Sequence, residues 1–363
     1  MKRNHVVAQS AANPTAYCQW QLCARSHDQS RRSWTMLSMA VRVAQALSLH
    51  VPQPAFVVSP FEQEMRGRLW IAIGLLDVQA SLDRASEPMI LTSWLQSHPP
   101  TNINDNDIST GFQRLVQQSG DFTDTPFALM ILKAQCIVRL LNVGNTAESP
   151  AVDMETRQTY VADFKQTSYQ LLRNCYPESD SFHWYARRVA DCVYASLQLI
   201  ALRPLQRNAK PITLLPIRGL GILKLSVEVL QKIQELYDDI RGHPWRWFEG
   251  IFVPWHALAV ALAELCELED LATMEIYWLP TKHAFDRFSS LVADSRQGML
   301  RKPIETLMTQ APMRRNHQLA DSPLSGVALH SEDSLSAVLD WNLPFLRTPM
   351  EQMVARSRFK EQL

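Results

Sequence analysis

The stretch SPFEQEMRGRLWIAIGLLDVQASL, residues 59–82, carries the strongest helical pattern in the chain. Ser59 can serve as the N-cap, Pro60 suits the first helical position, and Glu62 completes a capping box three residues after the serine. Apolar side chains then recur at steps of three or four residues, at Phe61, Met65, Leu69, Ala72, Leu76 and Ala80. This period predicts an amphipathic helix with one apolar stripe.

The segment before this helix has a similar pattern. Residues 33–49 carry one apolar face, formed by Leu37, Val41, Ala44 and Leu47. The following stretch Val-Pro-Gln-Pro, residues 51–54, ends the segment because a residue that precedes proline disfavours the helical conformation. We expect the two helices to pack as an antiparallel pair.

Six further helical patterns predict an all-α fold. Their ranges are 126–142, 153–175, 181–203, 219–240, 251–270 and 272–295. The chain has only 11 glycines and no regular short alternation of apolar residues, which argues against a sandwich, a barrel or a doubly wound sheet. Residues 86–109 are expected to form an ordered loop, because their prolines and the Asn/Asp cluster at 102–107 favour turns.

Three regions are expected along the chain. Residues 1–30 are a short N-terminal remnant, residues 31–295 a multi-helix domain, and residues 296–363 an irregular tail in which prolines recur. A short helix at 331–342 is possible within the tail, in the stretch SEDSLSAVLDWNLPF (331–345). Its interleaved acidic and apolar residues suit either a helix that docks on its own domain or an activation segment that binds a coactivator.

The charge balance argues against a free-standing nucleic-acid binder. The sequence has 36 basic and 36 acidic residues, and so no net charge. Nucleic-acid binders usually show a basic excess or stripe, because counterion release drives their affinity. The basic dipeptides are scattered, and none builds a nuclear localisation patch. We expect no direct nucleic-acid contact from this chain alone.

The cysteines do not have the spacing of a zinc site. They are Cys18, Cys23, Cys136, Cys175, Cys192 and Cys266. Only Cys18 and Cys23 are near neighbours, and they lie five residues apart, whereas a binuclear cluster needs six closely spaced thiolates paired as C-x2-C. We therefore expect no metal and no cofactor, and interpret the cysteines as reduced and mostly buried thiols.

Templates for catalysis and for membrane insertion are missing from the sequence. It contains no G-x-S-x-G elbow, no H-E-x-x-H helix and no Walker loop, so no enzyme and no catalytic residue is predicted. The longest apolar stretches, 127–141 and 251–266, are interrupted by charged residues or proline and are interpreted as buried helices. Residues 1–16 lack the apolar centre of a signal peptide.

An ordered run of motifs lies between Ser33 and Asp107. The motifs are SW (33–34), AVRVAQALSLH (40–50), SPFEQEMRGRLW (59–70), Asp77 and PPTNINDND (99–107). As an ordered set they resemble the middle homology (regulatory) domain of fungal-specific transcription factors, as in binuclear zinc cluster transcription factors. A second patch, PWRWFEGIFVPWHALAVALAELC (244–266), is similar to a tryptophan-histidine-alanine stretch that opens a long helix in the family.

The residues that match the family signature are interpreted as fold-forming contacts. They are Trp34, Arg42, His50, Arg66, Arg68, Leu69, Trp70, Asp77, Asp105, Trp255 and His256. Gly67 stands where the family usually has a third arginine, and Ile71 where it has a second tryptophan.

Three expectations concern individual members of this set. Trp70 should anchor a helix–helix contact. Arg66 and Arg68 should pair with loop carboxylates such as Asp105 or Asp107. His256 has no second His or carboxylate at ligand spacing, so a core or interface histidine is expected.

The resemblance implies a transcriptional regulator that acts in the nucleus. Because the family's zinc cluster has no counterpart in these residues, we expect an N-terminally truncated regulatory domain without its own DNA-binding module. It would control a metabolic or secondary-metabolite gene cluster through protein partners, either an intact regulator or the transcription machinery, and it could form a homo- or hetero-dimer. The alternatives are a helical protein–protein interaction module, a truncated gene model of a zinc cluster activator, and an accessory biosynthetic enzyme.

Overall fold

A computed structural model describes most of the chain. The described residues are 31–84, 87–96, 99–108, 122–143, 152–203, 218–249, 254–289 and 301–321. The chain divides into two compact units, Met1–Gln318 and Leu319–Leu363, and nearly all of the described residues belong to the first. The expected N-terminal remnant at 1–30 and the possible helix at 331–342 lie outside the described residues.

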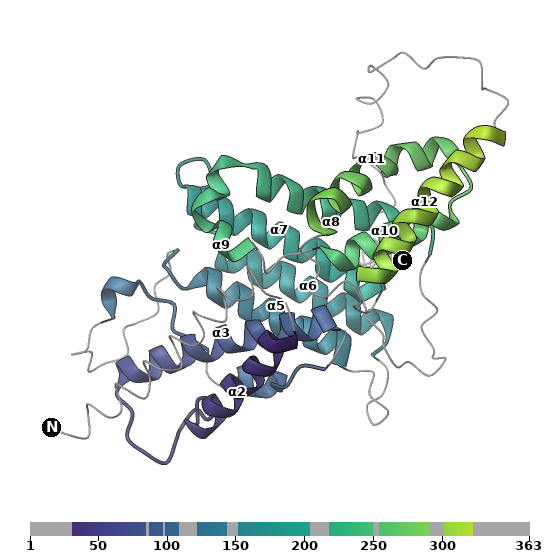
Figure 1. Ribbon diagram of the computed structural model, residues 1–363. Coiled ribbons are helices and arrows are strands. Elements are labelled where there is room, and N and C mark those ends of the chain that lie inside the picture. The colour runs from purple at the N-terminus through teal and green to yellow at the C-terminus, as the bar shows by residue number, and fades with distance from the viewer. Residues whose placement is uncertain are drawn as a thin grey trace, which may run out of the picture. The chain divides into compact units, whose positions relative to one another are not determined.

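Helices make up nearly all of the regular structure, and none of the described residues belongs to a strand (Figure 1). In chain order, the helices up to residue 171 are α2 (Arg31–Ala46), α3 (Pro60–Arg84), α4 (Thr92–Gln96), the 3-10 helix η1 (Asp105–Asp107), α5 (Pro126–Val143) and α6 (Met154–Leu171). They are followed by α7 (Ser181–Leu202), α8 (Leu220–Asp238), the 3-10 helix η2 (Ile240–Trp245), α9 (Arg246–Glu249), α10 (Trp255–Glu267), α11 (Leu271–Phe288) and α12 (Arg301–Asp321). The predicted all-α class is confirmed.

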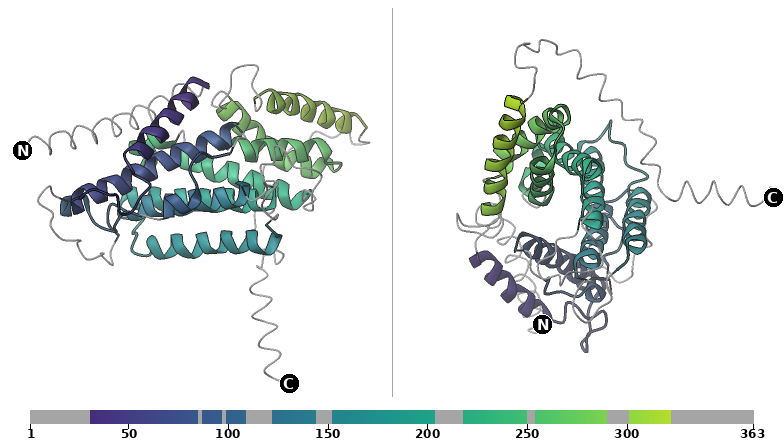
Figure 2. Two further views of the ribbon diagram at one scale, coloured as in Figure 1. Left: turned by 90° about the horizontal axis from the view of Figure 1, so that it is seen from below. Right: turned by 90° about the vertical axis from the view of Figure 1, so that its right-hand side faces the viewer.

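Helices that are neighbours in the chain are mostly neighbours in space. α5 packs on α6, α6 on α7, and α7 on α8, which in turn packs on α10 and α11. α2 lies on α3, and α3 lies on α5, so the expected contact between the first two helices is present. Figure 2 shows these long helices side by side, with α2 and α3 at one end of the series.

The main core extends from the later part of α3, through α5, to α12. Its central contributions come from α7, α8 and α10, where Leu223, Leu258, Leu262 and Leu265 are completely buried. A second, smaller core lies under α3 and is built around Trp70, Ile73 and Leu95. Burial of each such side chain stabilises the fold by about 1.5–3 kcal/mol, so these two clusters hold the helices together.

The helix α3 differs from the prediction of one apolar stripe. Its first turn follows the expected capping, because the Glu62 amide donates to Ser59 Oγ over 3.2 Å. Met65, which the stripe included, is exposed, whereas Trp70 and Ile73, which it did not include, are buried. The reason is that α3 is covered by α2 on one side and by α4 and α5 on others, so most of its circumference faces protein.

The expected irregular tail from residue 296 is wrong for residues 301–321, which form α12. Pro303 is compatible with this helix because it lies in the first turn, where a missing amide breaks no helical hydrogen bond. Pro312 lies inside the helix. Although a proline inside a helix is destabilising, α12 is stabilised by the burial of Ile304 and Ala311 and by the ion pair between Arg315 and Glu275 of α11.

The expected loop 86–109 and the expected helix 251–270 also differ in detail. The loop contains the short helices α4 and η1, which are too brief to leave a helical period in the sequence. The helix α10 begins only at Trp255, because Pro254 occupies its N-cap position.

Candidate functional site

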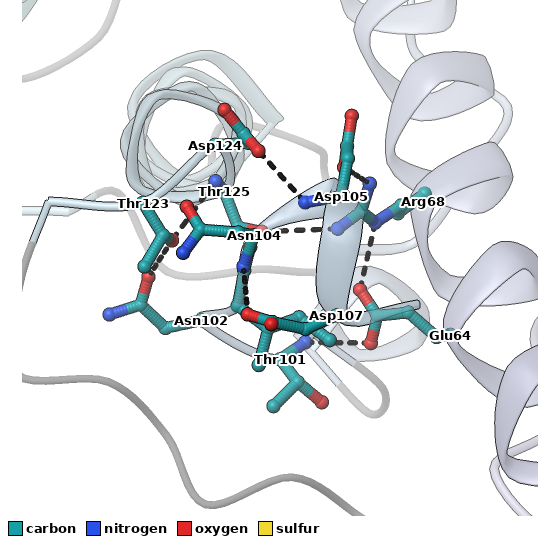
Figure 3. Close-up of polar contacts among 11 residues, drawn as sticks. Glu64, Arg68, Thr101, Asn102, Asn104, Asp105, Asp107, Thr123, Asp124 and Thr125 are labelled. Atoms are coloured by element: carbon teal, nitrogen blue, oxygen red, sulfur yellow. Dashed lines mark hydrogen bonds and ion pairs between the residues drawn. The ribbon is translucent and has the colours of Figure 1, made fainter. Parts of the chain in front are cut away.

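The expected pairing between the signature arginines and the loop carboxylates centres on Arg68. Its Nε donates to Glu64 Oε1 over 2.8 Å, and its other nitrogens donate to the Asp105 carboxylate and, over 3.2 Å, to Thr125 Oγ1. The second Glu64 oxygen accepts from the Thr101 amide at 2.9 Å. Figure 3 shows these groups converging from α3, from the loop 101–107 and from the residues before α5. The predicted Arg68–Asp105 pair is confirmed.

The Asn/Asp cluster of the loop 101–107 mainly stabilises its own fold. Asp107 pairs with no arginine side chain of the described residues; it accepts from the Asn104 amide at 3.3 Å. The Asp105 amide donates to Asp124 Oδ2 over 2.8 Å, which fastens the loop to the start of α5. The polar residues here are therefore used for loop closure.

The expected pairing of Arg66 with a loop carboxylate is wrong. Its guanidinium donates to the carbonyl oxygens of Leu47 at 2.9 Å and Ser48 at 2.8 Å, and it lies over the Phe56 ring. These carbonyls belong to the turn that follows α2. The arginine thus fastens this turn to α3.

Asp77 takes part in a buried ion pair. The Asp77 and Arg139 side chains are 2% and 1% exposed, and Arg139 Nη2 lies 3.1 Å from Asp77 Oδ2. Asp77 also accepts from the amides of Met89 and Ile90 at 2.9 and 3.0 Å. Arg139 donates further to the Gly74 carbonyl at 2.8 Å. The pair connects α3, α5 and the segment before α4.

Sequence reasoning missed Arg139. The one available signal in the sequence is that Arg139 interrupts an apolar helix with a charge. Burial lowers the pKa of its guanidinium, while the Asp77 carboxylate opposes that shift. A buried cation needs such a partner, because isolated charges are strongly disfavoured in the interior.

Trp70 anchors a helix contact as predicted, and His50 is part of it. Trp70 is completely buried, and its indole nitrogen donates to the Trp94 carbonyl oxygen over 3.0 Å. The His50 ring centroid lies 5.0 Å from that of Trp94 and 6.1 Å from that of Trp70. Leu69, the neighbouring signature residue, is partly buried against the same small core.

Trp34 and Arg42 lie away from this cluster, on the exposed side of α2. The Trp34 side chain is 38% exposed. Arg42 is exposed, and its Nη1 donates to Gln45 Oε1 at 3.4 Å within the same helix. The structure therefore does not join these two signature residues to the contacts of Arg68, Trp70 and Asp77.

Trp255 and His256 begin α10. Trp255 is buried, as an anchor of a core helix should be. His256 is partly buried, and burial lowers its pKa to about 4. Further along α10, buried Glu264 accepts from Arg203 at 2.8 Å and from the Gly219 amide at 2.7 Å. This carboxylate fastens the end of α7 and the start of α8 to α10.

Arg157 is a second buried arginine that sequence reasoning missed. It donates to the carbonyl oxygens of Leu141, Ile200 and Ala201 at 3.0, 3.0 and 2.7 Å. These carbonyls lie near the C-terminal ends of α5 and α7, where the helix dipole favours a cation. Nothing in the local sequence distinguishes Arg157 from an exposed helical arginine, because its acceptors are main-chain atoms.

The described residues hold no constellation that suggests a metal. No group of three or more His, Cys, Asp or Glu side chains in the described ranges could hold one. Burial raises the pKa of Cys175 to about 11 and that of Cys192 to about 12, which disfavours the thiolate that ligates metals. Cys18 and Cys23 lie outside these ranges. Among the helices the structure describes, none is long and apolar enough to cross a membrane.

The fold and these contacts define an all-helical scaffold in which most of the signature residues join helices and loops. Comparison with known proteins places the chain beside fungal transcription factors. It is 33% identical over 346 residues to the C6 finger domain transcription factor nscR of Arthroderma otae, covering 93% of this chain and 48% of that protein. It is 37% identical to nscR of Trichophyton tonsurans, over 77% of this chain and 39% of that protein.

A differently named relative extends the similarity. The C6 finger domain transcription factor adaR of Aspergillus niger is 30% identical over 82% of this chain and 41% of its own length. The chain thus spans less than half the length of these relatives. No family model and no solved structure matches it. The chain is therefore similar over most of its length to fungal C6 finger transcription factors.

Proposed function

We propose that these residues form the regulatory part of a fungal transcriptional regulator and act through protein partners. The observation that carries the proposal is the 33% identity to a C6 finger domain transcription factor over 93% of the chain. The expected partners are an intact regulator or components of the transcription machinery. The place of action is the nucleus, and the regulated genes belong to a metabolic or secondary-metabolite cluster.

The contacts of the signature residues support a scaffolding role for this region. Arg68, Trp70 and Asp77 are used to fix α3 against α4, α5 and the loop between them. These contacts favour a structural use of the three residues. We expect regulation to depend on the surface that the scaffold presents to other proteins.

The charge balance supports the proposal that these residues do not bind DNA by themselves. Equal numbers of basic and acidic residues, 36 of each, leave no basic excess to neutralise phosphates. The sequence also has no compact set of six cysteines of the kind a binuclear zinc cluster needs.

A reporter experiment tests the proposal. The chain is fused to a foreign DNA-binding domain and expressed with a reporter gene that carries the matching operator. We expect the fusion to change reporter output several-fold relative to the DNA-binding domain alone. If the fusion is silent but lowers the output of a co-expressed intact regulator, the chain is an interaction module that titrates that regulator. Silence in both arrangements contradicts the proposal.

A further inference from the structure

The helix α11 has a buried face and, on the opposite side, an exposed one. Met274, Thr281 and Phe288 recur at every seventh position and are completely buried, where α11 packs on α8 and α10. Because each residue turns the helix by about 100°, the side opposite to these three carries residues at spacings of four, three and four. They are Ala272, Ile276, Leu279 and His283, all of which are exposed. These four residues are called the α11 outer stripe below.

The α11 outer stripe is apolar at its centre, where a surface helix usually carries polar side chains. The Ile276 side chain is 41% exposed and the Leu279 side chain 55% exposed. They lie three positions apart and are therefore neighbours on the helix surface, and Ala272 extends the same surface by one turn. Alternating spacings of three and four are those of the side chains that pack against a second helix in a coiled coil.

The charges beside the stripe indicate which helix fits on it. Glu275 and Lys282 lie on the same edge of the stripe, seven residues or about two turns apart. Both are partly exposed, although Glu275 pairs with Arg315 of α12 and Lys282 with Asp286. An edge that carries one charge of each sign is complementary to itself when a second copy is turned end for end, as a two-fold axis requires.

We propose that the α11 outer stripe forms an antiparallel helix pair with the same stripe of a second copy of the chain. In such a pair the same edges of the two helices meet, so Glu275 of each copy faces Lys282 of the other. Ile276 and Leu279 lie between these charges and pack against their counterparts. In a parallel pair Lys282 would face Arg287, which has the same charge, so the charges select the antiparallel arrangement.

The size of the stripe sets the strength of the dimer. Residues 272–283 cover about three turns, or roughly 17 Å of helix. A single helix contact of this length buries less than the about 800 Å² per partner of a standard interface, so we expect weak, concentration-dependent self-association. The inference rests on the proposed function in one respect, since it names a second copy of the chain as one of the protein partners.

Sedimentation velocity of the purified full chain under reducing conditions tests the dimer. We expect the mean sedimentation coefficient to rise with concentration from the monomer value toward the dimer value. Leu279→Glu should raise the dissociation constant about tenfold or more, because it brings two carboxylates without partners into the centre of the contact. Met39→Glu is the matched control and should leave the dissociation constant unchanged, because Met39 is also 55% exposed but lies on α2.

Charge reversal tests the antiparallel arrangement. Glu275→Lys and Lys282→Glu should each weaken self-association about fivefold or more, since each variant alone would place like charges opposite one another. An equimolar mixture of the two variants should recover the wild-type dissociation constant, because the mixed dimer again has opposite charges at both ends. Recovery also shows that both variants are folded, although Glu275→Lys loses the ion pair with Arg315.

Three results would overturn the inference. They are a monomer at every concentration, equal effects of Leu279→Glu and Met39→Glu, and a mixture of the charge variants that associates no more strongly than either one alone. Sedimentation does not depend on transcription, so the two proposals can fail separately. A monomeric chain whose reporter fusion is active refutes the dimer and leaves the proposed function standing, whereas a confirmed dimer whose fusion is silent in both arrangements does the reverse.

Discussion

Arg139 and two main-chain amides surround the Asp77 carboxylate in the interior of the helical unit. Such a pair adds little net stability compared with an apolar core, but removing one partner leaves the other charge buried and uncompensated. The exposed pair between Arg68 and Asp105 has the same chemistry without that penalty, since the Asp105 side chain is 66% exposed. The two aspartates therefore form a natural comparison.

Replacing Asp77 by alanine should lower the free energy of unfolding by about 3–5 kcal/mol, because Arg139 would remain buried without a counter-charge. Asp105→Ala should lower it by no more than about 1 kcal/mol. Urea denaturation monitored by circular dichroism measures both values. Equal losses for the two variants would show that the Asp77–Arg139 pair is not the central contact of α3.

The His256 imidazole should make stability depend on pH. Its pKa is lowered from 6.5 to about 4 in the folded chain, so between these values the unfolded chain binds more protons. The contribution is fully present above pH 6.5 and is lost as the pH falls toward 4, by at most about 3 kcal/mol at about 1.4 kcal/mol for each pKa unit. Denaturation curves from about pH 4 to 7 should show a steeper loss for the wild type than for His256→Gln. Parallel losses would contradict a lowered His256 pKa in the folded chain.

At the scale of the helices, a glycine in α3 permits close packing against its neighbours, which a helical pattern in the sequence does not reveal. The helix contains Gly74, and a Cβ added there would lie 2.5 Å from Leu95 Cδ2 and 2.8 Å from Gln135 Oε1. Both neighbours are buried, so neither side chain can move into solvent. The glycine thus permits α4 and α5 to approach α3 closely, although glycine otherwise weakens a helix interior.

The sign of a glycine-to-alanine change should therefore differ between two helices. Gly74→Ala should reduce the free energy of unfolding by about 1 kcal/mol, because overpacking outweighs the gain in helix propensity. Gly221→Ala, in α8, meets nothing within 4 Å and should be neutral or stabilising by up to about 1 kcal/mol. Thermal unfolding of the two variants decides the point, and a stabilised Gly74→Ala chain would refute the close approach.

At the scale of the whole molecule, most of the long helices could be predicted from the sequence, but only part of their contacts could. The start of α3 was predictable because Ser59 and Pro60 are local signals. The Arg68–Asp105 pair could be expected once the two motifs were considered together. The contacts of Arg139 and Arg157 could not, because their acceptors lie 62 and 44 residues away or belong to the main chain. α12 was not predicted because its prolines indicated an irregular segment. The burial of Ile304 and Ala311, which stabilises the helix, is not visible in the sequence.

The reporter output of two fusion variants tests the central claim most directly, namely that this helical scaffold carries regulatory activity through partners. The foreign DNA-binding domain is fused to the chain carrying Asp105→Ala or Asp77→Ala, with matched expression levels. We predict that Asp105→Ala retains the wild-type output and that Asp77→Ala loses it, because only the second variant disrupts the fold. Wild-type output no different from that of the DNA-binding domain alone, with no effect on a co-expressed regulator, would contradict the claim.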